Sequence, residues 1–68
     1  MNLDIRLNIK NNLKNENVNG IISIIDDSVN KNDELVLPGL GVILELFWSE
    51  LNQIEKEKIS NIIIRKIS

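Results

Sequence analysis

The sequence has no cysteine, histidine, tyrosine, alanine or threonine among its 68 residues. Without thiols or imidazoles it can form no disulfide and no cysteine- or histidine-based metal site, and it lacks the commonest general base. An excess of positive charge is also absent, because eight Lys and Arg residues against ten Asp and Glu residues give a net charge of −2. Nucleic-acid-binding proteins usually carry a basic excess that neutralises phosphates. These absences argue against an enzyme and disfavour DNA as a partner.

Long apolar runs are missing as well. The most apolar window, residues 35–48, is interrupted by Pro38, two glycines and Glu45, whereas a membrane span needs about 20 apolar residues. The N-terminus lacks the charged and apolar regions of a signal peptide. We therefore expect a soluble intracellular chain with no membrane partner and no cofactor.

Isoleucine, asparagine and leucine dominate what is present, with 13, 11 and 9 residues respectively. An apolar content of 43% with 26% charged residues is typical of a folded chain. We expect one small domain over residues 1–68. A domain of this size buries only about 60% of its unfolded surface, so its stability is marginal unless the chain self-associates. The excess of isoleucine and asparagine, which AT-rich codons specify, indicates a low-GC bacterial source.

The first segment, residues 3–13, fits two kinds of secondary structure. Its apolar residues alternate with polar ones, as in a strand, yet three of them also recur every four positions, as in a helix: Ile5, Ile9 and Leu13. Asn2 or Asp4 is available as a helix cap. Because a single strand would have no obvious pairing partner, we favour a helix.

The next segment predicts an amphipathic helix. Six apolar residues form its stripe at helical spacing: Val18, Ile22, Ile25 and Val29, widened by Ile21 and Ile24. Asn15 or Asn17 can cap its start, and the polar residues 30–33 end it.

Pro38 suits the first turn of a third helix, because its missing N–H needs no partner there. The predicted buried stripe of this helix is Leu40, Ile43, Leu44, Phe47 and Leu51. Apolar character extends further around it, through Val42, Leu46 and Trp48. A helix this apolar is either central to the fold or partly covered by a partner.

A fourth helix begins at a predicted capping box, formed by Asn52 and Glu55. Arg65 and Lys66 complement the dipole at its C-terminal end. Its predicted buried stripe is Ile59, Ile62, Ile63 and Ile67. The fold class is therefore all-α, a small single domain of three to four short helices with a C-terminal αα-hairpin.

Few patterns carry chemistry, and we predict no catalytic, cofactor-binding or metal-binding residue. Gly39 and Gly41 could expose N–H groups to an anion, but the Lys-Ser/Thr of a phosphate loop does not follow them. We favour a role in the close approach of another helix. Phe47 is interpreted as a core residue, and Trp48 as the edge of the core or, alternatively, an anchor for a partner.

The stretch around Pro38 resembles the small acid-soluble spore protein I family. The family's core reads Leu-Pro-Gly-Leu-Gly-Val, two apolar residues, Glu, two apolar residues and Trp. Eight residues of this sequence match it: Leu37, Pro38, Gly39, Leu40, Gly41, Val42, Glu45 and Trp48. The segment ending in Arg6 and the helix with Asp26 resemble the family more loosely, whereas the Asn-rich residues 8–19 depart from it.

The resemblance implies a protein made in the developing forespore and stored in the spore core, without an assigned enzymatic activity. It separates the chain from the abundant spore proteins that coat DNA, and it transfers no binding residue. The implied role is sporulation or spore properties, through packing, protein interaction or storage. Three partner hypotheses are open: a spore-core protein, a second copy of this chain, and DNA, which the net charge disfavours.

Overall fold

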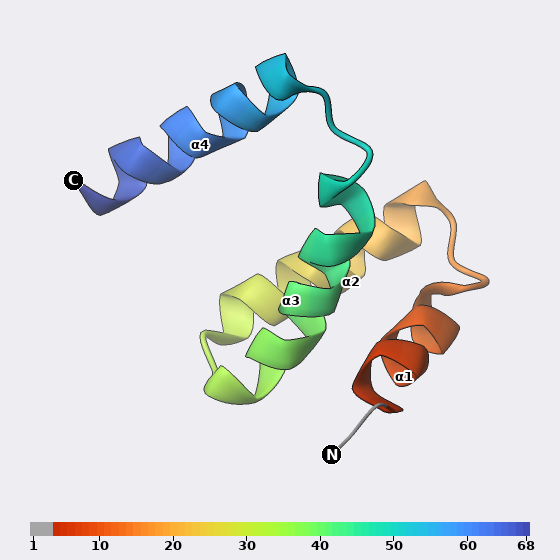
Figure 1. The fold of residues 1–68 in the computed structure, drawn as a ribbon. Coiled ribbons are helices and arrows are strands. Elements are labelled where there is room, and N and C mark those ends of the chain that lie inside the picture. Colours follow the sequence, from red (N-terminus) through yellow and green to blue (C-terminus); the bar gives the residue numbers. More distant parts are fainter. Residues whose placement is uncertain (1–3) are drawn as a thin grey trace.

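The computed structural model describes residues 4–68, which form four α-helices and a short 3₁₀ helix (Figure 1). In chain order these are α1 (Asp4–Leu13), α2 (Val18–Lys31), η1 (Glu34–Val36), α3 (Leu37–Trp48) and α4 (Gln53–Ile67). The predicted all-α class is confirmed, and the first segment is a helix rather than a strand. Across residues 4–68, no helix is long and apolar enough to cross a membrane.

Asparagine side chains cap α2 and α4 at predicted positions. Asn17 accepts a hydrogen bond from the Gly20 N–H at 2.8 Å. Asn52 accepts one from the Glu55 N–H, and the Glu55 carboxylate accepts one from the Asn52 N–H, each at 2.8 Å. This reciprocal pair is the predicted capping box, which supplies partners for N–H groups that a helix start leaves unpaired.

The remaining helix ends also follow local chemistry. Pro38 lies in the first turn of α3, as predicted. α2 ends at Asn32, whose φ of 51° places it in the left-handed region that Asn tolerates better than most residues. Of the two caps considered for α1, Asp4 lies in its first turn, and Asn2 lies outside the described residues.

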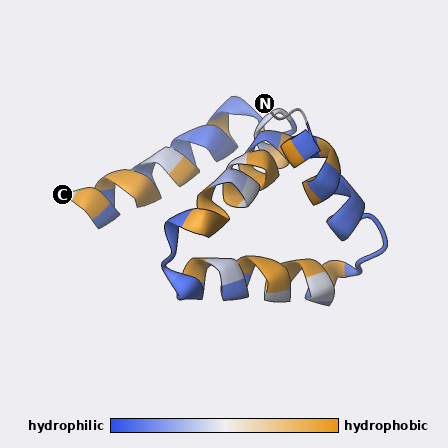
Figure 2. Cartoon of the chain, turned by 90° about the horizontal axis from the view of Figure 1, so that it is seen from below, coloured by the Kyte–Doolittle hydropathy of each residue, from blue (hydrophilic) through white to orange (hydrophobic). Residues whose placement is uncertain are grey.

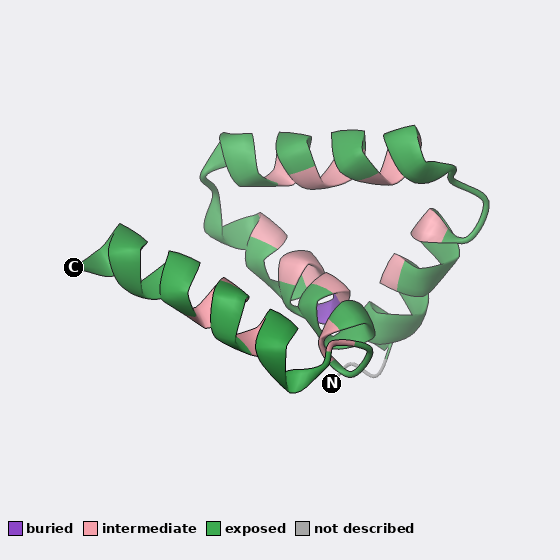
Figure 3. Cartoon of the chain, turned by 90° about the horizontal axis from the view of Figure 1, so that it is seen from above, coloured by how far each residue is buried: buried purple, intermediate pink, exposed green. Residues whose placement is uncertain are grey.

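The other elements are arranged around α3. α1 packs against α3, while η1 contacts both α2 and α3. α4 diverges from this group and extends away from it, as Figures 1 and 3 both show. Residues 49–52 link α3 to α4 as the predicted hairpin, but the hairpin is open, since the two helices make few close backbone approaches.

Val42 is the most buried residue, with 6% of its surface exposed, and it is the one buried residue among those described (Figure 3). It lies on the side of α3 that faces α1, because the same side carries Gly39 beside Ile9 and Glu45 beside Arg6. Residues three apart share a helix face. The core of the described chain is therefore centred on the contact between α1 and α3.

The predicted stripe of α3 is partly wrong. Leu40 and Ile43 are half-buried, as expected, but Leu44 and Phe47 are exposed. Leu51 is also half-buried, but it lies in the link after α3, which ends at Trp48, and not on the helix as predicted. Phe47 is therefore not the core residue that the sequence predicted. The physical reason is that α1 covers the side bearing Val42, which the periodicity had placed at the margin.

The stripe of α2 is also displaced from its prediction. Val18, Ile22 and Val29 are exposed, whereas the half-buried side chains are Ile21, Ile24, Ile25 and Ser28. Two adjacent isoleucine pairs, 21–22 and 24–25, offer overlapping stripes that differ by a rotation of about 80°. The contact with η1 selects between them.

In α4 the predicted buried stripe holds only at its beginning. Ile59 is half-buried, but Ile62, Ile63 and Ile67 are exposed. The helix diverges from the rest of the domain, so Ile63 still faces Trp48 across a groove, whereas the last turn lies apart from the other helices (Figure 1).

Gly39 and Gly41 differ in what surrounds them, which gives a matched pair of variants. A Cβ at Gly39 would lie 3.2 Å from Ile9 Cδ1 of α1, whereas one at Gly41 would meet nothing within 4 Å. The predicted close approach of another helix is thus seen at Gly39 and not at Gly41. We expect Gly41→Ala to stabilise the fold by about 0.5–1 kcal/mol, because alanine loses less backbone entropy in a helix.

Thermal unfolding followed by circular dichroism measures this effect, since 1 kcal/mol corresponds to about 4–8 °C for a domain of this size. Gly39→Ala is the control. It brings a similar gain in helix propensity, but its new methyl group crowds the Ile9 side chain, which opposes that gain. Its melting temperature should rise less than that of Gly41→Ala. An equal or larger rise for Gly39→Ala would contradict the packing of α1 on α3.

Candidate functional site

Glu45 connects α3 to α1 through a two-point ion pair. The Arg6 Nε donates to Glu45 Oε1 and the Arg6 Nη2 donates to Glu45 Oε2, both at 2.8 Å. The forked geometry of the guanidinium matches that of a carboxylate and fixes the orientation of both groups. Both side chains are more than half exposed, so the pair serves to set the register of the two helices more than to stabilise the fold.

The ion pair shifts the ionisation of both partners. The hydrogen bond from Arg6 lowers the pKa of Glu45 below its ordinary value of 4.5, assisted by the charges of Arg6 and Lys10 and opposed by partial desolvation. The hydrogen bond and charge of Glu45 raise the pKa of Arg6. Hydrogen bonding to the charged form favours that form in both cases.

This direction predicts how acid affects the fold. A lowered carboxylate pKa adds stability that is present above the unfolded pKa and is lost as pH falls through the folded pKa. We expect Glu45→Gln to be less stable than wild type at neutral pH, with the difference vanishing well below pH 4.5. Urea unfolding at neutral pH and at a pH well below 4.5 measures this difference in the free energy of unfolding.

The control for this prediction is Glu50→Gln, which removes an exposed carboxylate outside the ion pair. It should leave the pH dependence close to that of wild type. A Glu45→Gln deficit that persists unchanged in acid would show that its effect is not ionic.

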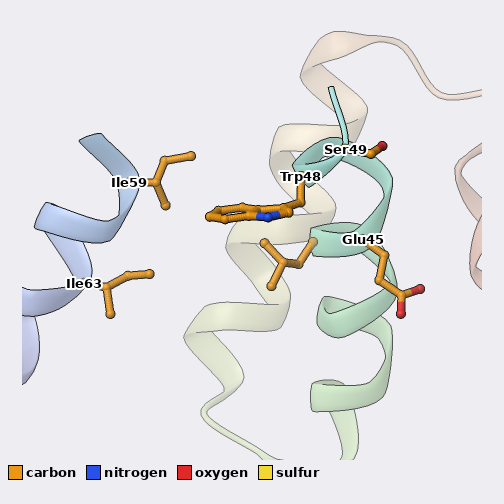
Figure 4. A pocket seen from close by; sticks show the side chains of 6 residues that line it. Glu45, Trp48, Ser49, Ile59 and Ile63 are labelled. Atoms are coloured by element: carbon orange, nitrogen blue, oxygen red, sulfur yellow. The ribbon is translucent and has the colours of Figure 1, made fainter. Parts of the chain in front are cut away.

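Trp48 lies at the end of α3 and faces α4 across an open groove. Leu44 and Trp48 line one wall, Ile59 and Ile63 line the other, and Glu45 and Ser49 complete it (Figure 4). The volume of this Trp48 groove is about 460 Å³. Its lining is almost entirely apolar, so it can accept an apolar side chain or ligand.

Lys56 of α4 lies over the Trp48 ring, with its Nζ 5.6 Å from the ring centroid. At that distance the ammonium is attracted by the negative face of the indole. Lys56 is half-buried. Trp48 is thus the main link between α3 and α4, at the edge of the core.

The eight residues of the family motif take different places in the structure. Glu45 and Trp48 line the same groove. Val42 is buried, and Gly39 and Leu40 are half-buried. The other three are exposed and lie outside the groove: Leu37, Pro38 and Gly41.

Sequence reasoning missed two residues that complete this site, Arg6 and Lys56. A signal for the first was present, since Glu45 is the one charged residue within the apolar stretch 37–48 and an isolated charge on such a helix needs a partner. No comparable signal singled out Lys56. Within residues 4–68 no group of three acidic side chains is placed to hold a metal ion.

The chain is similar to known proteins over most of its length. A family model described as Small, acid-soluble spore protein I matches residues 3–67. Proteins of that name are 32% identical over 59 residues in Halalkalibacterium halodurans, covering 87% of each chain, and 33% identical over 57 residues in Geobacillus kaustophilus, covering 84% of this chain and 83% of the relative. The one in Bacillus subtilis is 30% identical over 59 residues, covering 87% and 83%. No solved structure matches the chain.

Proposed function

Because the chain belongs to the small, acid-soluble spore protein I family, we propose that it is a non-enzymatic protein of the spore core that acts through packing and protein interaction. The family resemblance carried by residues 37–48 is confirmed by this match. The location in the spore core and the contacts with other proteins are what we propose beyond membership of the family.

The contacts of Glu45 and Trp48, the polar and the aromatic residue of the motif, support a packing role. Glu45 is held by Arg6 of α1, and Trp48 faces Ile59 and Lys56 of α4. Both therefore hold helices together, and neither presents a reactive group to a substrate. The absence of histidine and cysteine from the whole sequence supports the same interpretation.

Deletion of the gene in the source bacterium tests the role. We expect spores that lack the protein to differ from wild type in resistance, germination or outgrowth, and the protein to be recovered from the spore-core fraction by mass spectrometry. Normal spores in all three assays, with the protein found in vegetative cells instead, would contradict the proposal.

Complementation separates interaction from amino-acid storage. A store of amino acids depends on composition, so Trp48→Ala and Phe47→Ala would both restore the deletion strain. A packing or interaction role depends on the groove, so Trp48→Ala should fail where the neighbouring Phe47→Ala succeeds. Equal restoration by both variants would favour storage.

DNA association is the alternative that the charge already disfavours. Two of the eight basic residues, Arg6 and Lys56, are engaged within the fold, which further reduces the charge available to phosphates. We expect no retardation of duplex DNA in a gel at low salt with micromolar protein. Retardation that weakens as salt increases would establish the alternative.

A further inference from the structure

The chain exposes much more surface than a folded monomer of its mass. Its accessible surface is 5862 Å², whereas a compact monomer of 7.8 kDa exposes about 4,400 Å². The surplus of about 1,500 Å² lies within the roughly 1,000–2,500 Å² that each subunit of an obligate homodimer buries. A second copy of the chain is therefore an occupant of the right size.

Four of the fifteen exposed large apolar side chains among the described residues lie on the second half of α4: Ile62, Ile63, Ile64 and Ile67. Ile59, Ile63 and Ile67 share one side of this helix, because they recur every four residues. Exposure along that side rises steadily, from half-buried Ile59 through Ile63 at 51% to Ile67 at 79%. Figure 2 shows the apolar character continuing to the end of the helix, where it projects beyond the rest of the domain.

The same chain offers a matching concave surface. The Trp48 groove opens beside Ile59 and Ile63 on the side of α4 that faces α3 (Figure 4). A groove next to a projecting apolar stripe is self-complementary under a two-fold axis, since each copy can insert its stripe into the groove of the other.

We propose that two copies of the chain associate through α4, which lies antiparallel to its counterpart with Ile63 close to the two-fold axis. In this arrangement Ile67 of each copy lies over Ile59 and the Trp48 groove of the other. The association supplies tertiary contacts to the last turn of α4, which lies beyond the groove in its own chain, and isolated helices of about 12–15 residues are marginal in water.

The charges at the two surfaces are also complementary. Glu50 follows Ser49, which lines the groove, and is the acidic side chain there that lies outside the ion pair of Glu45 with Arg6. The charged side chains in the last turn of α4, which enters the groove, are both basic, Arg65 and Lys66. Opposite charges that face each other at the rim of an interface favour encounter and fix its register.

Sedimentation equilibrium of the full chain over a range of concentrations tests the proposal. The wild type should show twice the 7.8 kDa chain mass at high concentration. Ile67→Gln should weaken the association at least tenfold. Ile54→Gln is the matched control, because Ile54 is also exposed on α4 but lies on a different side of the helix, and it should leave the association unchanged.

Cross-linking gives a second measurement that does not depend on affinity. The chain has no cysteine, so Ile63→Cys should form a disulfide-linked pair under mild oxidation, whereas Ile54→Cys should not. Circular dichroism of each variant confirms that it is folded. A wild type that stays monomeric at millimolar concentration, or equal effects of the substitutions at positions 54 and 67, would overturn the proposal.

Discussion

Val42→Ala should destabilise the fold by about 2 kcal/mol, which is a large effect for so small a domain. Val42 lies on α3 where it faces α1, and it is the one buried residue among those described. Truncation to alanine removes two methyl groups from this contact. At about 4–8 °C per kcal/mol, the melting temperature should fall by roughly 8–16 °C.

The matched control for this prediction is Val18→Ala. Val18 is 74% exposed in the first turn of α2, so the same chemical change there should alter stability by less than about 0.5 kcal/mol. Both variants must be compared at one protein concentration, since self-association would make the melting temperature depend on it. Equal losses from the two variants would mean that the core does not lie between α1 and α3.

Features governed by neighbours in the sequence could be predicted. Unpaired N–H groups at helix starts account for the caps at Asn17 and Asn52 and for the hydrogen bond that Glu55 accepts from the Asn52 N–H. They also account for Pro38 in the first turn of α3, where an N–H would have no partner. Their chemistry is complete within four residues. Sequence alone was therefore sufficient for an all-α fold of three to four helices and for the starts of α2, α3 and α4, whereas η1 was not predicted.

Features governed by distant residues could not be predicted in the same way. Arg6 and Glu45 are 39 positions apart, and nothing local to either one specifies the other. The burial of Val42 depends on which side of α3 α1 covers. Apolar residues occur on every side of α3, so periodicity offers several faces and only the tertiary contact chooses one.

The candidate site divides along the same line. The sequence singled out Trp48 and Glu45 because the motif contains them. Trp48 is half-buried, which agrees with its interpretation as the edge of the core. The groove between them and α4 could not be foreseen, because the expected burial of Ile62, Ile63 and Ile67 required a closed hairpin. The open angle of α4 is what turns a predicted core stripe into an exposed surface.

Trp48→Ala should cost about 2 kcal/mol, roughly half of what truncation of a fully buried aromatic costs. The indole is half-buried, lines the groove opposite Ile59 and interacts with Lys56. Its removal deletes the main contact between α4 and the rest of the chain. Because α4 is short and depends on tertiary contacts, its helicity should fall selectively.

Two measurements separate this effect from general unfolding. Hydrogen exchange should accelerate at α4 amides well before those of α1 and α3, and far-ultraviolet circular dichroism should report a partial loss of helix. Phe47→Ala is the control, because Phe47 is exposed, lies one residue away and does not line the Trp48 groove; it should leave α4 protected. Trp48→Phe should retain part of the protection, since a phenyl ring still covers Ile59 and attracts the Lys56 ammonium, although less strongly than an indole does. Uniform acceleration across all four helices in Trp48→Ala would instead place Trp48 in a common core and contradict its role as the link that holds α4.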